Sequence, residues 1–172
     1  LLYVVYRILF LMFAEQRGMM DDRGNLYTEE YSITKLRERS ETREQEDRDE
    51  DLWEGLKATF RMVGKGVTDK DAGLRTPGYN GGLFDNQKLE YILDSACTNS
   101  ELLSAIDDLT HIEQKGFRQR ISYADLGVEE IGAVYESLLE FTPQTAETTL
   151  NIDGQTISPG EFYLDSRGMN RK

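Results

Sequence analysis

The stretch "LWEGLKATFRMV", from Leu52 to Val63, decides the fold class of this chain. Its apolar side chains recur at intervals of three and four residues, which is the spacing of one buried stripe on an α-helix. The stripe consists of Leu52, Trp53, Leu56, Phe60 and Val63. We therefore expect a helix that packs against a core and stops near Gly64.

A second buried helix is expected at the start of the chain, in the apolar run "LLYVVYRILFLMFA" from Leu1 to Ala14. This run is shorter than the roughly 20 residues that cross a bilayer, and Arg7 stands in its middle. A signal peptide would carry its charge before the apolar stretch rather than inside it. The run thus predicts a buried helix with Gly18 as its C-terminal cap, and no membrane contact.

The second half of the chain carries further helix signals. Asp85 is placed to cap a helix at "NQKLEYIL", and "TNSE", from Thr98 to Glu101, has the spacing of a capping box. The clearest periodicity lies in "VEEIGAVYESLLEF", which begins at Val128. Gly132 inside that helix costs about 1 kcal/mol relative to alanine, so we expect another backbone to approach it closely.

The tail changes to a β pattern. Asp153-Gly154 lies between runs rich in Thr and Ile, which indicates a β-hairpin, and "EFYL" either extends a strand or adds one. The fold class expected is mainly α: an irregular helical bundle with a long internal loop at about 64–84 and a small C-terminal β-hairpin. The domains expected are a helical module at 1–146 and a hairpin with its exit at 147–172.

Acidic side chains outnumber basic ones, 32 to 20, and the net charge of -12 repels phosphate. Eight of the acidic residues lie in the segment from Glu38 to Asp51, which has three basic residues and no apolar one. This acidic segment indicates a solvated helix end or a mobile linker. A surface that imitates DNA is the functional alternative.

The segment "YNGGLFD", from Tyr79 to Asp85, combines turn residues with apolar anchors. Gly81 and Gly82 let the backbone turn, while Tyr79, Leu83 and Phe84 are expected to hold the turn in the helical core. Whether this loop also presents a surface to DNA or to another domain is open.

Few residues of this sequence suggest a catalytic or metal-binding role. His111 and Cys97 are the only residues of their types, so the sequence predicts no disulfide framework and no metal cluster, and a reducing, cytoplasmic setting. Glu129, Glu130 and Glu136 could pair for acid–base work, but capping and docking explain them better because no His, Asp or Lys converges on them. We expect no catalytic, cofactor-binding or metal-binding residue in this chain.

Two basic clusters could contact a DNA backbone. The first contains Lys115, Arg118 and Arg120, and the second contains Arg167, Arg171 and Lys172. Solvated turns are the alternative explanation for both clusters.

Several segments taken in order resemble the helical region of large bacterial adenine-specific DNA methyltransferases. These are the fused type IIG restriction–modification enzymes and related methyltransferases of phage defence. The segments are "LLYVVYRILFLMFAEQRG", "YS" at Tyr31, "LW" at Leu52, "YNGGLFD" and "ISYADLGVEEIGAVYESLLEFTP". The resemblance spans nearly the whole chain and is most specific in the second half. It implies structural roles for the motif residues Tyr79, Gly81, Gly82, Leu83, Phe84, Asp85, Tyr123, Glu129, Glu130, Gly132, Tyr135 and Glu136.

In that family this region precedes the catalytic domain. A stretch like "MNRK" leads there into a "GSYYTP"-like motif, an S-adenosylmethionine site and an Asn-Pro-Pro-Tyr/Phe motif, none of which occurs in this sequence. The resemblance therefore implies a non-catalytic brace or connector, cut from a parent enzyme that uses S-adenosylmethionine to methylate adenine in DNA, with or without restriction activity. Its partners would be the missing methyltransferase domain and, through the parent, DNA. The alternative is a free-standing acidic helical module that binds proteins as a DNA mimic.

Overall fold

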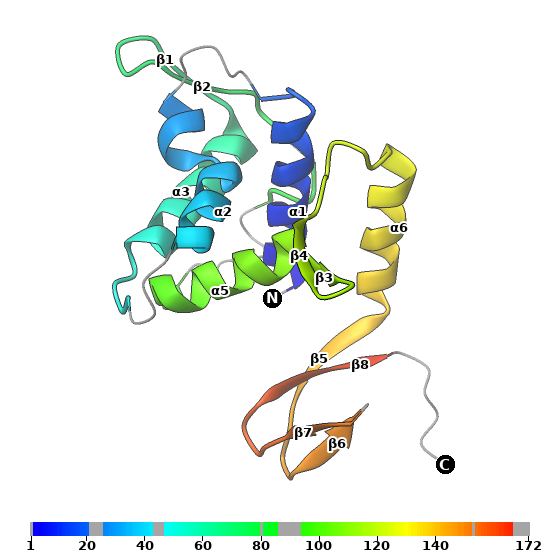
Figure 1. Ribbon diagram of the computed structural model, residues 1–172. Coiled ribbons are helices and arrows are strands. Elements are labelled where there is room, and N and C mark those ends of the chain that lie inside the picture. The colour runs from blue at the N-terminus through cyan, green and yellow to red at the C-terminus, as the bar shows by residue number, and fades with distance from the viewer. Residues whose placement is uncertain are drawn as a thin grey trace. The chain divides into compact units, whose positions relative to one another are not determined.

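A computed structural model describes residues 2–20, 26–42, 47–79, 81–85, 94–152 and 154–166 (Figure 1). Contacts divide the chain into two compact units. The N-terminal unit is Tyr3–Leu126, and the C-terminal unit is Gly127–Lys172 together with Leu1–Leu2.

The N-terminal unit is built mainly from helices. Its helices are α1 (Leu2–Gln16, whose first residue belongs to the other unit), the π-helix η1 (Tyr27–Tyr31), α2 (Ile33–Thr42), α3 (Asp51–Lys65) and α5 (Asn99–Thr110). Two antiparallel hairpins complete it: β1 (Val67–Asp69) with β2 (Leu74–Thr76), and β3 (His111–Gln114) with β4 (Phe117–Arg120). The helix expected at 86–93 lies outside the described residues.

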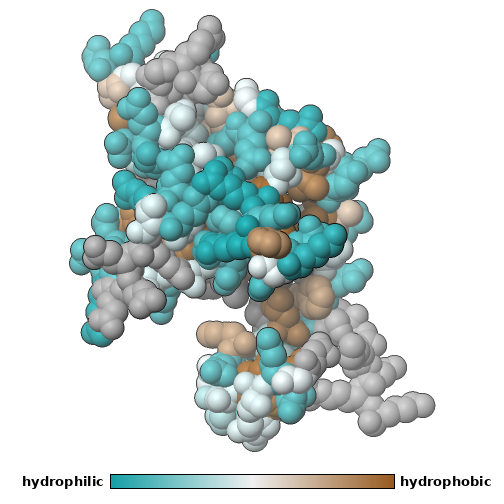
Figure 2. Space-filling model, in the orientation of Figure 1, coloured by the Kyte–Doolittle hydropathy of each residue, from teal (hydrophilic) through white to brown (hydrophobic). Residues whose placement is uncertain are grey.

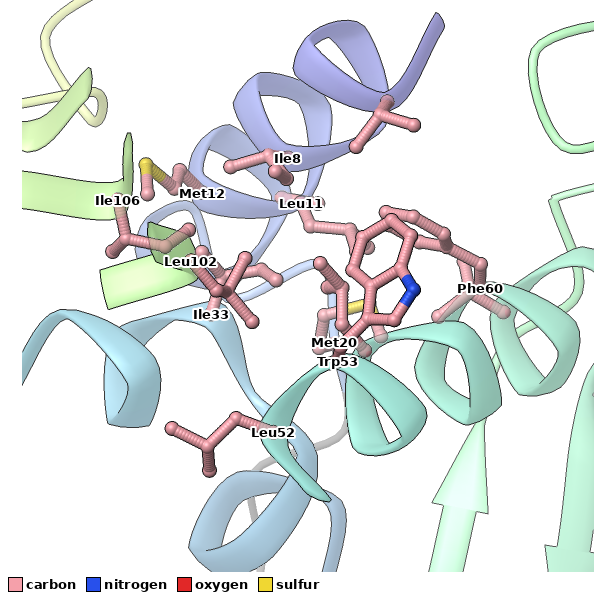
Figure 3. Close-up of a cluster of buried hydrophobic side chains, with 14 of the residues drawn as sticks. Ile8, Leu11, Met12, Met20, Ile33, Leu52, Trp53, Phe60, Leu102 and Ile106 are labelled. Carbon is pink, nitrogen blue, oxygen red and sulfur yellow. The ribbon is translucent and has the colours of Figure 1, made fainter. Parts of the chain in front are cut away.

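The core lies where α1, α2, α3 and α5 meet (Figure 3). Leu11 from α1, Ile33 from α2, Phe60 from α3 and Ile106 from α5 are each completely shielded from solvent. All five residues of the predicted α3 stripe are buried, which confirms the helix and the face that it packs inward.

Two predicted helix ends are confirmed. Gly18 has a φ of 65°, and the N–H groups of Gly18 and Met19 donate to the carbonyls of Glu15 and Ala14 at 3.1 and 2.8 Å. This is the paired hydrogen-bond pattern of a Schellman motif. At the start of α5, Thr98 and Glu101 form the reciprocal capping box.

Part of the predicted long loop is instead the β1–β2 hairpin. The Asp69 carboxylate accepts from the N–H groups of Asp71 and Ala72, both at 3.0 Å, and closes the turn. Helix α3 also runs one residue past the expected stop, to Lys65, and its C-cap is Gly66, whose N–H donates to the Met62 carbonyl at 2.8 Å. The hairpin escaped prediction because its strands are three residues long and mostly polar.

The acidic segment is more ordered than expected. Its first residues belong to α2, which ends at Thr42, and residues 43–46 lie outside the described part. Asn99, which is buried, then clamps the rest: its side-chain amide donates to the carboxylates of Asp47 and Asp51 at 3.0 and 2.7 Å and accepts from the N–H of Leu52. Residues 48–51 are exposed, as expected of a solvated segment, while Asn99 holds Asp47 and Asp51 in place.

The C-terminal unit combines helix α6 (Val128–Leu139) with the strands β5 (Phe141–Thr145), β6 (Leu150–Ile152), β7 (Gln155–Ile157) and β8 (Phe162–Ser166). The β6–β7 hairpin turns at Gly154, which has a φ of 83°, and confirms the prediction. β5 pairs with β8 in a second antiparallel sheet. α6 and β5, which the sequence assigned to the helical module ending at 146, thus group with the strands that follow.

Helices make up the larger share of the regular structure in the described residues. The described strands form four two-stranded antiparallel sheets, whereas the sequence predicted a single hairpin. Among the described helices, none has the length and apolar character needed to cross a membrane.

Candidate functional site

The YNGGLFD loop is held in place by Arg7, which lies at the centre of α1 with no exposed surface. The Arg7 Nε donates to the carbonyl of Leu83 at 2.7 Å, and Nη2 donates to the carbonyl of Asp85 at 2.9 Å. The guanidinium also lies 5.2 Å from the ring centre of Phe60 and 5.3 Å from that of Phe84. A single buried cation thus connects the loop to α1 and α3.

Aromatic contacts complete this anchor. The Phe10 ring meets those of Tyr79 and Phe84 edge to face, at 5.1 and 5.5 Å between ring centres. The Tyr79 hydroxyl donates to the carbonyl of Met19 at 3.2 Å, and its N–H donates to the carbonyl of Val63 at 2.9 Å. The expected core contacts of Tyr79, Leu83 and Phe84 are present.

Burial sets the electrostatics of this anchor. Removal from water lowers the pKa of Arg7 to about 10, although the nearby Asp85 acts in the opposite direction. Burial likewise raises the pKa of Tyr79. Arg7 remains charged at neutral pH, so the group is a fixed cation that holds carbonyls and not a group poised to exchange a proton.

The glycine on which the loop depends is not the expected one. A Cβ added to Gly81 would meet nothing within 4 Å, whereas a Cβ added to Gly64 of α3 would lie 3.1 Å from the Phe84 carbonyl oxygen. Gly66 and Gly78, at the two ends of the β1–β2 hairpin, approach each other just as closely. Glycine is therefore favoured at Gly64, where α3 packs against the loop, whereas the space beside Gly81 would admit a side chain.

Tyr123, another motif residue, is buried in the N-terminal unit. Its hydroxyl donates to the carbonyl of Leu109 at 2.5 Å, and burial raises its pKa, with a smaller opposing effect from Arg37. The N–H groups of Tyr123 and Ala124 both donate to the side-chain oxygen of Gln16, at 2.8 and 3.1 Å. The end of α1 therefore fixes the segment that leads out of this unit.

A buried carboxylate links α1 to α2. Glu15 accepts from the Tyr27 hydroxyl at 2.7 Å, from the N–H groups of Ile33 and Thr34 at 2.9 and 2.8 Å, and from the Thr34 hydroxyl at 2.8 Å. Burial raises the pKa of Glu15, and the four hydrogen bonds oppose that rise. Because it satisfies the first N–H groups of α2, Glu15 serves as a cap supplied from another helix.

The predicted basic cluster lies on the β3–β4 hairpin, where its arginines are engaged. Arg118 pairs with Asp107 of α5, and Arg120 pairs with Glu41 of α2. The hydrogen bond from Arg120 holds the pKa of Glu41 below its ordinary value. Lys115 occupies the turn with a φ of 55°. The two arginines fasten the hairpin to the helices, which leaves less of their charge for a phosphate backbone.

His111 lies between the same two carboxylates. Its Nε2 is 3.2 Å from Glu41 and its Nδ1 is 3.3 Å from Asp107. No group of three side chains suited to metal binding occurs among the described residues. Burial raises the pKa of Cys97, which disfavours its reactive thiolate.

A shallow pocket of about 270 Å³ opens between η1, α2 and α3. Its lining mixes the charged side chains of Glu30, Lys35, Arg39 and Asp51 with leucines. Two of these charges are already satisfied, since Lys35 pairs with Glu38 and Asp51 accepts from Asn99. The pocket brings together no set of groups that indicates a reaction.

In the C-terminal unit, Glu129, Glu130 and Glu136 lie exposed on α6. Tyr135 is 38% exposed, and a Cβ at Gly132 would meet nothing within 4 Å, which contradicts the expected close approach of a backbone. Arg167, Arg171 and Lys172, the second basic cluster, lie outside the described residues.

A stretch that covers most of the C-terminal unit differs in charge from the rest of the chain. Residues 121–166 contain nine Asp or Glu and no Lys, Arg or His. Among the residues of the C-terminal unit whose burial is described, Ala146 alone is buried. Figure 2 shows pale and brown atoms at the surface of its strands. Sequence reasoning missed this base-free stretch, although counting charges along the chain would have found it.

Comparisons with known proteins found no matching family model, no similar curated protein and no similar solved structure.

Proposed function

We propose that residues 1–172 are a non-catalytic bracing and connecting region of a larger cytoplasmic enzyme that modifies DNA. By its resemblance, the parent enzyme transfers a methyl group from S-adenosylmethionine to the amino group of adenine, with or without an upstream nuclease. The region itself holds no S-adenosylmethionine. Its partners are the methyltransferase domain of the same polypeptide and, through that domain, DNA.

One observation carries this proposal: the loop that contributes the specific YNGGLFD motif is packed around the buried Arg7. Its carbonyls accept hydrogen bonds from the guanidinium of Arg7 inside the protein, and its aromatic rings pack against Phe10 and Arg7. Residues that act on a substrate must reach it, whereas these residues hold helices together. The motif therefore supports a bracing role rather than a catalytic one.

The acidic interaction module is the second candidate, and the base-free stretch 121–166 favours it. A surface of one charge sign can occupy a basic groove. In the N-terminal unit, however, the carboxylates of Glu15, Asp47 and Asp107 are used in internal hydrogen bonds or ion pairs. A DNA mimic needs its carboxylates free, so imitation of DNA is the weaker proposal for that unit.

Transfer of labelled methyl groups from S-adenosylmethionine to DNA tests the proposal. Three proteins are compared: the full-length gene product, the same protein without residues 1–172, and the 172-residue chain alone. Activity confined to the full-length protein is expected, because the brace positions the catalytic domain.

Two outcomes would count against the proposal. Undiminished transfer without residues 1–172 would remove the bracing role. No transfer by the full-length protein on DNA of varied sequence would remove the methyltransferase assignment and favour the acidic interaction module.

A further inference from the structure

Helix α6 exposes apolar side chains that its own unit does not cover. Val128 is 78% exposed and Val134 is 40% exposed. With 3.6 residues per turn, these two residues, Ile131 and Tyr135 fall within one stripe along the helix. Val128, Val134 and Tyr135 are exposed and Ile131 is half-buried. Because such a stripe normally packs against a core, this exposure indicates a surface that another molecule completes.

Acidic residues border this stripe on both sides. By the same helical spacing, Glu129 and Glu136 lie along one edge and Glu130 lies along the other. All three are exposed. The stretch 121–166 contributes no lysine, arginine or histidine that could neutralise them. The α6 surface, defined as this stripe with its three glutamates, is therefore apolar in the middle and negative at its edges.

Gly132 lies on the edge of the stripe. Glycine inside a helix costs about 1 kcal/mol relative to alanine, yet nothing in the described chain approaches the position of its absent Cβ. The space that this glycine leaves open is available to an incoming side chain or backbone.

We infer that the α6 surface docks a protein element whose apolar side chains are flanked by lysine or arginine. Opposite charges at the rim favour such a partner and speed its association. The negative rim disfavours a second copy of this chain, since identical α6 surfaces would bring like charges together. It equally disfavours nucleic acid and anionic membranes. This inference goes beyond the bracing role and does not depend on the chemistry of the parent enzyme.

The test measures fluorescence anisotropy of labelled amphipathic helical peptides with the 172-residue chain. The first peptide has a leucine face with lysine flanks, the second has the same face with glutamate flanks, and the third has lysine flanks around a serine face. We expect only the first to bind, and to bind more weakly as salt rises from about 50 mM to about 500 mM.

Matched variants locate the binding. The double substitution Val128→Ser with Val134→Ser is expected to weaken binding about tenfold, given the apolar area that each valine offers. The control, Ile112→Ser with Phe117→Ser, removes two equally exposed apolar residues from the β3–β4 hairpin and is expected to change nothing. Circular dichroism checks that both variants keep their helix content.

Four results would overturn the inference. These are no binding of the first peptide, equal binding of the third peptide, equal losses in the two double variants, or self-association of the chain that Val128→Ser with Val134→Ser abolishes. The last result would identify a second copy as the occupant of the α6 surface.

Discussion

Arg7 shows how one residue can organise a large part of the N-terminal unit. It lies 76 and 78 positions away along the chain from the two residues whose carbonyls it binds. In the sequence, Arg7 is visible only as a charge that interrupts an apolar run. A lone arginine in a buried helix must find acceptors inside the protein, but the sequence does not say which. The structure was therefore needed to identify the carbonyls that Arg7 binds.

Replacement of Arg7 by methionine is expected to destabilise the N-terminal unit by about 2 kcal/mol, because the two carbonyls lose their donors while the apolar bulk is kept. The matched control is Arg61→Met, which changes an exposed arginine. Urea unfolding followed by the fluorescence of Trp53, the only tryptophan, reports on this unit. Equal unfolding midpoints for the two variants would show that Arg7 is not an anchor.

The contacts of the YNGGLFD loop predict a larger loss of stability for a substitution at Gly64 than for one at Gly81. Gly64→Val is expected to cost about 1 to 3 kcal/mol, because its side chain would press on the backbone of Phe84. Gly81→Val is expected to cost much less, since its side chain enters open space. Thermal unfolding of both variants checks this order, and the reverse order would refute the packing described for the loop.

The pair of Arg120 and Glu41 predicts a dependence on pH. Its hydrogen bond lowers the pKa of Glu41 in the folded protein below the ordinary value of 4.5. The stabilisation is therefore present above that value and is lost as the pH falls through the folded pKa. Arg120→Gln is expected to lower the urea midpoint slightly at about pH 7 and by less at about pH 3, where Glu41 is closer to its folded pKa. An equal difference at both pH values would contradict the pairing.

Among the elements, those with strong local signals were predictable from the sequence. The α3 stripe, the TNSE capping box and the Asp153-Gly154 turn each depend on residues close in the chain. The β1–β2 and β3–β4 hairpins were not predicted. Their strands are short and mostly polar, and the second hairpin turns through Lys115 at a positive φ, which a lysine seldom adopts. The Asn99 clamp and the β5–β8 pairing join residues too far apart for local patterns to show.

Asn99 provides the test at the level of elements, because it ties the acidic segment to the start of α5. Asn99→Ala is expected to destabilise the N-terminal unit by about 2 kcal/mol, through the loss of buried hydrogen bonds. Asn99→Asp is expected to cost more, because it has the same shape but places a third carboxylate beside Asp47 and Asp51. Urea unfolding measures both, and a milder effect for Asn99→Asp would contradict the clamp.

The whole molecule consists of two units that differ in how completely they bury apolar surface. The N-terminal unit has a continuous core drawn from four helices. In the C-terminal unit, Ala146 alone is buried among the residues whose burial is described, and the unit is small for independent stability. If the second unit connects the first to another domain, its stability must come partly from that contact.

Hydrogen exchange tests most directly the proposal that the C-terminal unit connects the N-terminal unit to another domain. Backbone amides of the 172-residue chain are compared with the same amides in the full-length gene product. We predict strong protection of α1, α3 and α5 in both proteins, because their core is complete. Helix α6 is formed in the chain alone but uncovered, so its amides are predicted to exchange faster there than in the full-length protein. Equal protection of α6 in the two proteins would contradict the connecting role.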